Sequence, residues 1–184
     1  MGGGIDAWKG LVSRSEPDQG IYLIEGDEPP EEVISLACGL EEGAFRFYRT
    51  LSSQSKDGEV ESLFERLSQA EIQHKEKLWG KYKTLTGGRV TRKAFESDIK
   101  AKTMEGGKTA DQVLGEYPDW IQDPREALQL AMSLETDALD LYLRMAVKSR
   151  KEETKAVFYT LANDEKTHLR SLGNLMRAKL VAGR

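Results

Sequence analysis

The chain has 184 residues, enough for one globular domain with a short additional segment. Its formal net charge is −4, so we expect no basic surface of the size that nucleic-acid binding requires. No apolar run approaches the roughly 20 residues that cross a bilayer, and no signal peptide opens the chain, so we expect a cytoplasmic protein. A single cysteine, Cys38, excludes an internal disulfide framework and any four-thiolate site for zinc or iron.

Residues 1–28 differ in composition from the rest of the chain. The first ten residues are rich in glycine, and a short apolar run at 21–24 has the length of one strand. Because one strand cannot bury its own apolar side chains, we expect this segment to dock on the main body or on a partner. We therefore divide the chain into an N-terminal appendage, 1–28, and a main domain, 29–184.

From residue 29 onward, apolar residues recur at helical spacing. The predicted long helices cover about 29–54, 59–85, 123–148 and 152–182. Asp123 followed by Pro124 is typical of a helix start, and the glycines after Thr86 are typical of a helix end. The pattern predicts an all-α four-helix bundle.

The second and third long helices are joined by a long connection, residues 87–123. Within it, Thr109-Ala-Asp-Gln112 has the form of a capping box and predicts a short helix. The connection is long enough to run the length of the bundle as a crossover.

An internal repeat is built around the only two histidines, His74 and His168. Each histidine follows a glutamate by three residues, each of those glutamates follows another by 30 residues, and a tyrosine comes seven residues after the upstream glutamate. The members of the repeat, always 94 residues apart, are Glu41 and Glu135, Glu71 and Glu165, His74 and His168, and Tyr48 and Tyr142.

This spacing predicts that the acidic and histidine side chains meet. Residues three apart share a helix face, so each Glu-x-x-His pair points one way. The midpoint between Glu41 and Glu71 falls in the break between the first two helices, which returns Glu71 to the level of Glu41. The second hairpin does the same, so two packed hairpins place four glutamates and two histidines at the centre of the bundle.

Four buried carboxylates repel one another unless their pKa values rise or cations neutralise them. Two divalent metal ions would balance four negative charges, and the ligand set is that of dimetal carboxylate bundles. Oxygen and imidazole ligands without thiolate favour iron or manganese, with zinc as an alternative. A Glu-x-x-His pair by itself is weak evidence, and an old duplication that has lost its metal remains the competing hypothesis.

The segments Leu40-Glu-Glu-Gly-Ala-Phe-Arg-Phe-Tyr48, Met104-Glu-Gly-Gly107 and Leu161-Ala-Asn-Asp-Glu-Lys-Thr-His168 resemble helices and crossover of the ferritin-like superfamily. Over about residues 30–182 the chain is most similar to rubrerythrin-type di-iron carboxylate proteins. This resemblance implies a ferritin-like four-helix bundle with a long crossover between helices 2 and 3. It also implies two iron ions that reduce peroxide or dioxygen.

The resemblance implies a role for each repeated residue. Glu41 and Glu135 would be the ligands from the first and third helices, Glu71 and Glu165 would bridge the two metals, and His74 and His168 would be terminal ligands. Typical rubrerythrins have a further ligand glutamate where this chain has Ala138, and a rubredoxin domain that this chain lacks. We therefore expect a simpler, symmetric site and an external electron donor, a rubredoxin or a reductase.

Three further residues are candidates for contact with the ligands. Tyr48 and Tyr142 lie two turns after a presumed ligand and would hydrogen-bond it or donate an electron, although a core position explains them equally well. Asp164 would orient His74 or His168 as an acceptor. We expect Cys38 to be a small buried apolar side chain.

The motif Gly3-Gly-Ile-Asp-Ala-Trp-Lys-Gly10 resembles the closing segment of rhodanese (sulfurtransferase) domains, and suggests that the chain is the back end of a longer fusion. The sequence thus favours a di-iron oxidoreductase that acts on peroxide or dioxygen, as a homodimer without nucleic-acid or membrane partners. The alternative is a non-catalytic module for iron storage or sensing, linked to sulfur transfer if the rhodanese likeness has functional meaning.

Overall fold

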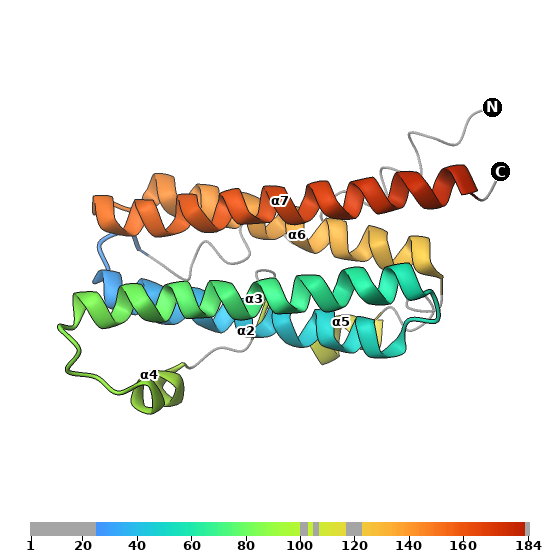
Figure 1. Cartoon of the computed structure of the whole chain (residues 1–184). Helices are drawn as coiled ribbons and strands as arrows, with labels where there is room; N and C mark the ends of the chain where they lie inside the picture. The colour runs from blue at the N-terminus through green and yellow to red at the C-terminus, as the bar shows by residue number, and fades with distance from the viewer. Residues whose placement is uncertain (1–24, 100–102, 105–106, 117–122, 183–184) are drawn as a thin grey trace.

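The computed structural model describes residues 25–99, 103–104, 107–116 and 123–182. Every regular element in these ranges is an α-helix, which confirms the all-α prediction. Two helical hairpins pack along a common long axis, with their connecting turns at opposite ends of the bundle (Figure 1). No helix among the described residues is long and apolar enough to span a membrane. The predicted strand at 21–24 and most of the predicted appendage fall outside the described ranges.

The first hairpin consists of α2 (Pro30–Gln54) and α3 (Gly58–Leu85). Proline in the first turn of α2 costs no hydrogen bond, and the two acidic residues after it face the positive end of the helix dipole. The Asp57 side chain caps α3 by accepting from the backbone N–H groups of Glu59 and Val60. These local signals begin each helix where the sequence predicts it.

The second hairpin consists of α6 (Pro124–Lys148) and α7 (Glu152–Ala182). The Asp123 carboxylate accepts from the backbone N–H of Arg125 at 2.7 Å and caps α6, as predicted. At the far end, Ser149 closes α6 by donating its hydroxyl to the carbonyl of Met145 at 2.7 Å. The two hairpins have matching lengths, which brings equivalent levels of the repeat together.

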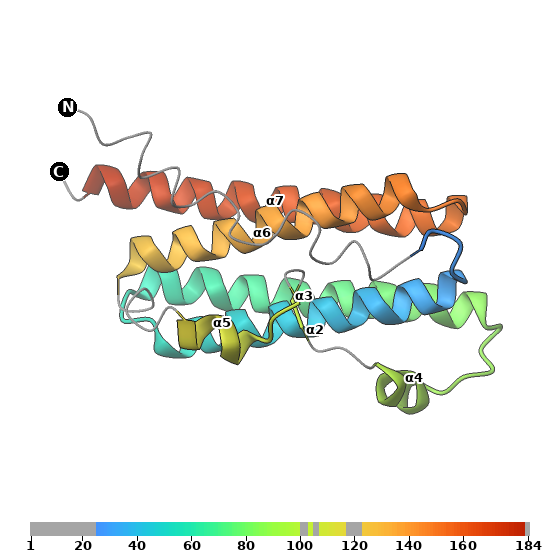
Figure 2. The ribbon, with the colours of Figure 1, turned by 180° about the vertical axis from the view of Figure 1, so that it is seen from behind.

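The crossover carries two short helices, α4 (Arg92–Asp98) and α5 (Ala110–Glu116). The capping box predicted for α5 is present, because Thr109 N–H donates to the Gln112 side chain and Gln112 N–H donates back to the Thr109 hydroxyl. α5 packs on α2 in the view from behind (Figure 2). The sequence did not predict α4, since its seven residues bury one side chain, Phe95, and show no periodicity.

The apolar core is divided into two clusters. On α2, Ile34 and Leu40 belong to one cluster and Phe47 and Leu51 to the other, so that the level of Glu41 lies between them. The same division occurs along the other three long helices. The acidic level predicted from the repeat therefore forms a polar layer between two apolar halves.

The crossover passes very close to α2 at Gly43. A Cβ atom on Gly43 would lie 2.6 Å from the carbonyl carbon and oxygen of Thr103, inside the contact limit for backbone atoms. This approach seats the next residue, Met104, against the bundle with 2% of its surface exposed. The turn after Met104 closes with a hydrogen bond from Gly107 N–H to the Met104 carbonyl at 2.8 Å, and Gly107 has φ of 74°.

We predict opposite effects for alanine at two helical glycines. Gly43→Ala should lower the free energy of unfolding by roughly 1–3 kcal/mol, because the crossover backbone must move. Gly173→Ala, in α7, should raise it by roughly 0.5–1 kcal/mol, since no atom lies within 4 Å of the new Cβ and alanine favours the helix. Urea denaturation of both variants measures the effect, and a stabilising Gly43→Ala would contradict the close approach.

Candidate metal centre

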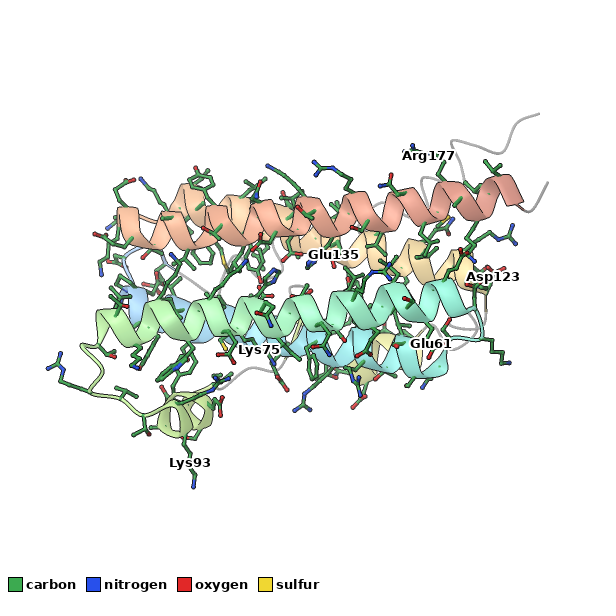
Figure 3. All side chains as sticks on the ribbon, viewed as in Figure 1. Glu61, Lys75, Lys93, Asp123, Glu135 and Arg177 are labelled. Carbon is green, nitrogen blue, oxygen red and sulfur yellow. The ribbon has the colours of Figure 1, made fainter. Side chains whose placement is uncertain are left out.

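The polar layer contains the six side chains that the repeat singles out. α2 supplies Glu41, α6 supplies Glu135, and the other two long helices supply the Glu-x-x-His pairs. Figure 3 shows Glu135 directed into the space between the hairpins, near the middle of the bundle. All six are buried, with 1–6% of their surface exposed: Glu41, Glu71, His74, Glu135, Glu165 and His168. The structure therefore brings every predicted ligand into one cluster.

Each histidine contacts glutamates through its Nδ1 atom. His74 Nδ1 lies 2.9 Å from Glu41 Oε2 and 2.9 Å from Glu71 Oε2. His168 Nδ1 lies 3.0 Å from Glu165 Oε2 and 3.4 Å from Glu71 Oε1, so Glu71 reaches both halves of the cluster. The two imidazole rings stack with centroids 5.2 Å apart.

The two tyrosines of the repeat connect one hairpin to the other. Tyr48 on α2 donates its hydroxyl to Glu135 on α6, and Tyr142 on α6 donates to Glu41 on α2 at 2.8 Å. The partner of each tyrosine is thus on the opposite hairpin and not on its own helix. Burial and the nearby Glu135 charge raise the pKa of Tyr48 well above its usual value, so its hydroxyl remains a donor. The crossed bonds fix one oxygen of each of these glutamates.

The four carboxyl groups separate into two kinds. Burial opposes the ionisation of Glu41 and Glu135, but the hydrogen bonds that they accept outweigh it and lower both pKa values, that of Glu41 to about 2. Burial and the charge of Glu41 raise the pKa of Glu71 well above its usual range, and burial and the charge of Glu135 do the same for Glu165. In the metal-free cluster, one carboxyl of each hairpin is ionised and the other is protonated.

The histidines complete the charge balance. Burial opposes their protonation, but hydrogen bonds to Glu41 and Glu135 raise the pKa of His74 and bring that of His168 to about 9. These directions favour a metal-free cluster of two carboxylates, two carboxylic acids and two imidazolium ions, whose charges sum to zero. In the metal-free cluster, four bound protons balance the charge of the four carboxylates. Two divalent metal ions would supply the same positive charge.

The donor atoms fit metal ions. One oxygen, Glu71 Oε2, has no hydrogen-bond partner among the described residues, although it lies 2.9 Å from His74 Nδ1. Potential ligand atoms within 4.8 Å of one another form three groups: Glu71, His74 and His168; Glu71, Glu135, Glu165 and His168; and Glu41, His74 and Glu165. The buried cluster is therefore able to hold metal ions.

A small pocket of about 10 Å³, room for one water-sized molecule, adjoins the carboxylates. Ala44, one turn after Glu41, and Ala138, one turn after Glu135, form part of its wall, together with Met104 from the crossover. The sequence places Met104 in a crossover segment but does not mark it as a residue of the site, because helical periodicity gives no information on the path of the crossover. The short side chains of Ala44 and Ala138 leave this space beside Glu135 open.

Asp164 makes the two halves of the cluster unequal. Its Oδ2 lies 3.3 Å from His74 Nε2 and 3.1 Å from the exposed Lys77 ammonium. The repeat places Ala70 at the position that would serve His168 in the same way. The sequence named both histidines as partners for Asp164, and the structure pairs it with His74. Within the part of the chain that the structure describes, only His74 has a carboxylate beside its Nε2 atom.

The family model described as Rubrerythrin matches residues 32–176, well over half of the chain. The chain belongs to the rubrerythrin family. No curated protein and no solved structure matches it. Membership of this family agrees with the buried carboxylate and histidine cluster, and the matched range contains all six members of that cluster.

We predict that the metal-free protein of this family loses stability as the pH rises from 6.5 to 9. The folded pKa of His168 lies near 9, above the value of 6.5 for an unfolded histidine, so its contribution is complete below pH 6.5 and is lost as pH rises through 9. The raised pKa values of Glu71 and Glu165 act in the same direction.

The melting temperature of the chelator-treated protein should fall by at least about 4 °C over this range, given about 1.4 kcal/mol per pKa unit and 2–4 °C per kcal/mol. Thermal unfolding followed by circular dichroism measures it, with His168→Gln as a control that should have a shallower dependence. A melting temperature that stays level or rises would contradict the charge assignment.

Proposed function

We propose that the chain is a dimetal carboxylate oxidoreductase that binds two iron ions and reduces peroxide, with dioxygen as the second candidate oxidant. The observation that carries the proposal is the burial of four glutamates and two histidines in mutual contact at one level of the bundle. The four carboxylates of this cluster are neutralised only when protons or cations are bound. The family suggests peroxide as the substrate. A purified sample could hold manganese or zinc instead, because both accept the same ligands.

The groups of donor atoms support the proposed ligand roles. Among the glutamates, Glu71 and Glu165 each occur in two of the three groups, whereas Glu41 and Glu135 occur in one each, which supports Glu71 and Glu165 as the residues shared between the metals. Glu41 with His74, and Glu135 with His168, would complete one ion each. Tyr48 and Tyr142 each hold one oxygen of Glu135 and Glu41, and the second oxygen of each glutamate lies beside a histidine Nδ1, where it would turn to a bound metal ion.

Two reduced iron ions supply two electrons in total, one each, which is the number that reduction of a peroxide to water requires. The protein's own residues restrict and shape this chemistry. The pocket beside Glu135 and Ala138 admits a molecule of about the size of water, and the crossover residue Met104 covers it. With Ala138 in place of a further glutamate, the ligand set stays at four carboxylates.

Electrons must come from outside the described site. The chain has one cysteine and so cannot form a four-thiolate iron centre. We therefore include a separate reductant, a rubredoxin or a reductase, in the proposed reaction. The homodimer, the cytoplasmic location and the rhodanese-like appendage remain predictions from the sequence.

We predict that the metal-free chain binds two Fe(II) ions and releases protons as it does so, up to four at pH 6.5. The protons come from Glu71, Glu165, His74 and His168, whose pKa values are raised in the metal-free cluster. Anaerobic titration in weak buffer, with metal analysis, measures both quantities. Glu71→Ala should lose one or both ions while its circular dichroism stays helical.

The same titration of an Asp164 variant tests whether the two halves of the metal cluster differ, as the contact of Asp164 with His74 predicts. Asp164→Asn should still bind two ions, but one of them roughly 10–100-fold more weakly, since the loss of an acceptor behind a ligating histidine has effects of that size. If Glu71→Ala still binds two Fe(II) ions per chain, as the unmodified protein is expected to, this result would count against the assigned site.

We predict fast, stoichiometric oxidation when hydrogen peroxide meets the anaerobically loaded protein. Two Fe(II) ions should be oxidised per peroxide in a single exponential phase, because both electrons come from one site. Stopped-flow absorption measures the rate, with Glu71→Ala as the control. Slow, incomplete oxidation would favour the alternative of an iron-storage or iron-sensing module.

A further inference from the structure

A second and larger pocket, of about 330 Å³, opens on the outer side of the α2–α3 hairpin, where α4 packs against it. This volume is within the range of small-molecule sites, roughly 300–1,000 Å³. None of the six residues of the metal cluster lines it. The pocket is therefore separate from the metal cluster, and it has room for a molecule larger than a metal ion or a water-sized oxidant.

The apolar part of the pocket has aromatic walls. Cys38, Trp79, Phe95 and Ile99 line it, and the Trp79 and Phe95 rings contact each other with centroids 5.3 Å apart. Burial raises the pKa of the Cys38 thiol to about 12, so this side chain is a neutral part of the wall. Flat apolar surfaces of this kind favour a planar ring compound.

The charged part of the pocket is balanced. Lys75 pairs with Glu42 at 2.6 Å, and Arg92 pairs with Glu96 at 2.6 Å. Two positive and two negative groups give the lining no net charge, which favours an uncharged occupant over an anion. The ammonium and guanidinium groups together carry eight N–H donors, more than their carboxylate partners in the described residues use. The remaining donors suit carbonyl oxygens on the edge of a ring.

The pocket and the metal cluster share two helices. Glu42 follows Glu41 on α2, and Lys75 follows His74 on α3. Cys38 is one helical turn before Glu41, a rise of roughly 4.5 Å along the axis. A ring in the pocket would therefore lie directly behind the helices that present two of the cluster's ligands.

We propose that this pocket binds a fused-ring quinone and that a quinol bound there delivers electrons to the metal centre. The proposed binding of a quinone depends only on the pocket, whereas the proposed delivery of electrons rests on the proposed function. The reaction balances, because the quinol gives up two electrons and two protons and leaves as the quinone. The peroxide takes up both electrons and both protons and becomes two water molecules.

Binding is tested on the metal-free full chain with 2,3-dimethyl-1,4-naphthoquinone, whose substituted ring blocks addition of a thiol. The matched probe is 2,3-dimethylnaphthalene, the same ring system without carbonyl oxygens. Equilibrium dialysis should show the quinone bound at least tenfold more tightly than the hydrocarbon. Equal affinity, or no binding of either compound, would overturn the proposal.

Three variants locate the bound ring. Ile99→Trp fills the pocket and should weaken quinone binding at least tenfold. Arg92→Met keeps an unbranched apolar stem, removes the guanidinium donors and should weaken binding severalfold. Arg66→Met, on the exposed face of α3 away from the pocket, is the matched control and should bind as the unmodified chain does. Quinone binding that is unchanged in both pocket variants would place the ring elsewhere and overturn the proposal.

Delivery is tested on the iron-loaded chain under anaerobic conditions. The corresponding naphthoquinol should be oxidised with one peroxide consumed per quinol, at least tenfold faster than with Ile99→Trp. Single-turnover oxidation of preloaded Fe(II) should be the same in both proteins, since the variant leaves the ligands intact. If preloaded iron does not react, the proposed function fails; if it reacts but quinol oxidation does not depend on the pocket, the delivery role fails.

Discussion

The fold depends on how four carboxyl groups are neutralised in the middle of an apolar bundle. An isolated buried carboxylate costs several kcal/mol, and here four lie in one layer with two histidines. Accepted hydrogen bonds lower the pKa values of Glu41 and Glu135, which favours their ionised form, whereas burial and neighbouring charge raise those of Glu71 and Glu165, which favours their protonated form. The metal-free layer is therefore tolerable, but only through protons that bound cations would replace.

This layer also explains the arrangement of the apolar core. The two apolar clusters lie on either side of the polar level, and they hold the four helices in the register that brings the ligands together. The crossed bonds from Tyr48 to Glu135 and from Tyr142 to Glu41 join the hairpins at the level where apolar packing is interrupted. Structure and site are thus consequences of the same repeat.

Much of this could be predicted from the sequence because the informative signals are local and repeated. The helix start at Asp123 follows from capping, and the cluster follows from equal 30-residue spacings on paired helices. Signals of this kind need no knowledge of the path between the hairpins.

Features that depend on the crossover could not be predicted. α4 is too short to show periodicity, and the close contact of Gly43 with Thr103 requires the position of a segment far away in the sequence. The choice of His74 over His168 as the partner of Asp164 depends on side-chain placement across the hairpins. The larger pocket forms where α4 packs on α2 and α3, and no sequence motif predicts that packing.

The central claim is that two cations occupy this polar layer, held between the hairpins. Anomalous diffraction at the iron absorption edge, from crystals of the iron-loaded protein, tests it most directly. The account predicts two peaks roughly 3.5–4 Å apart, each beside one histidine and both within reach of Glu71 and Glu165. A single peak, peaks at the protein surface, or a layer with no anomalous signal under saturating iron would contradict it.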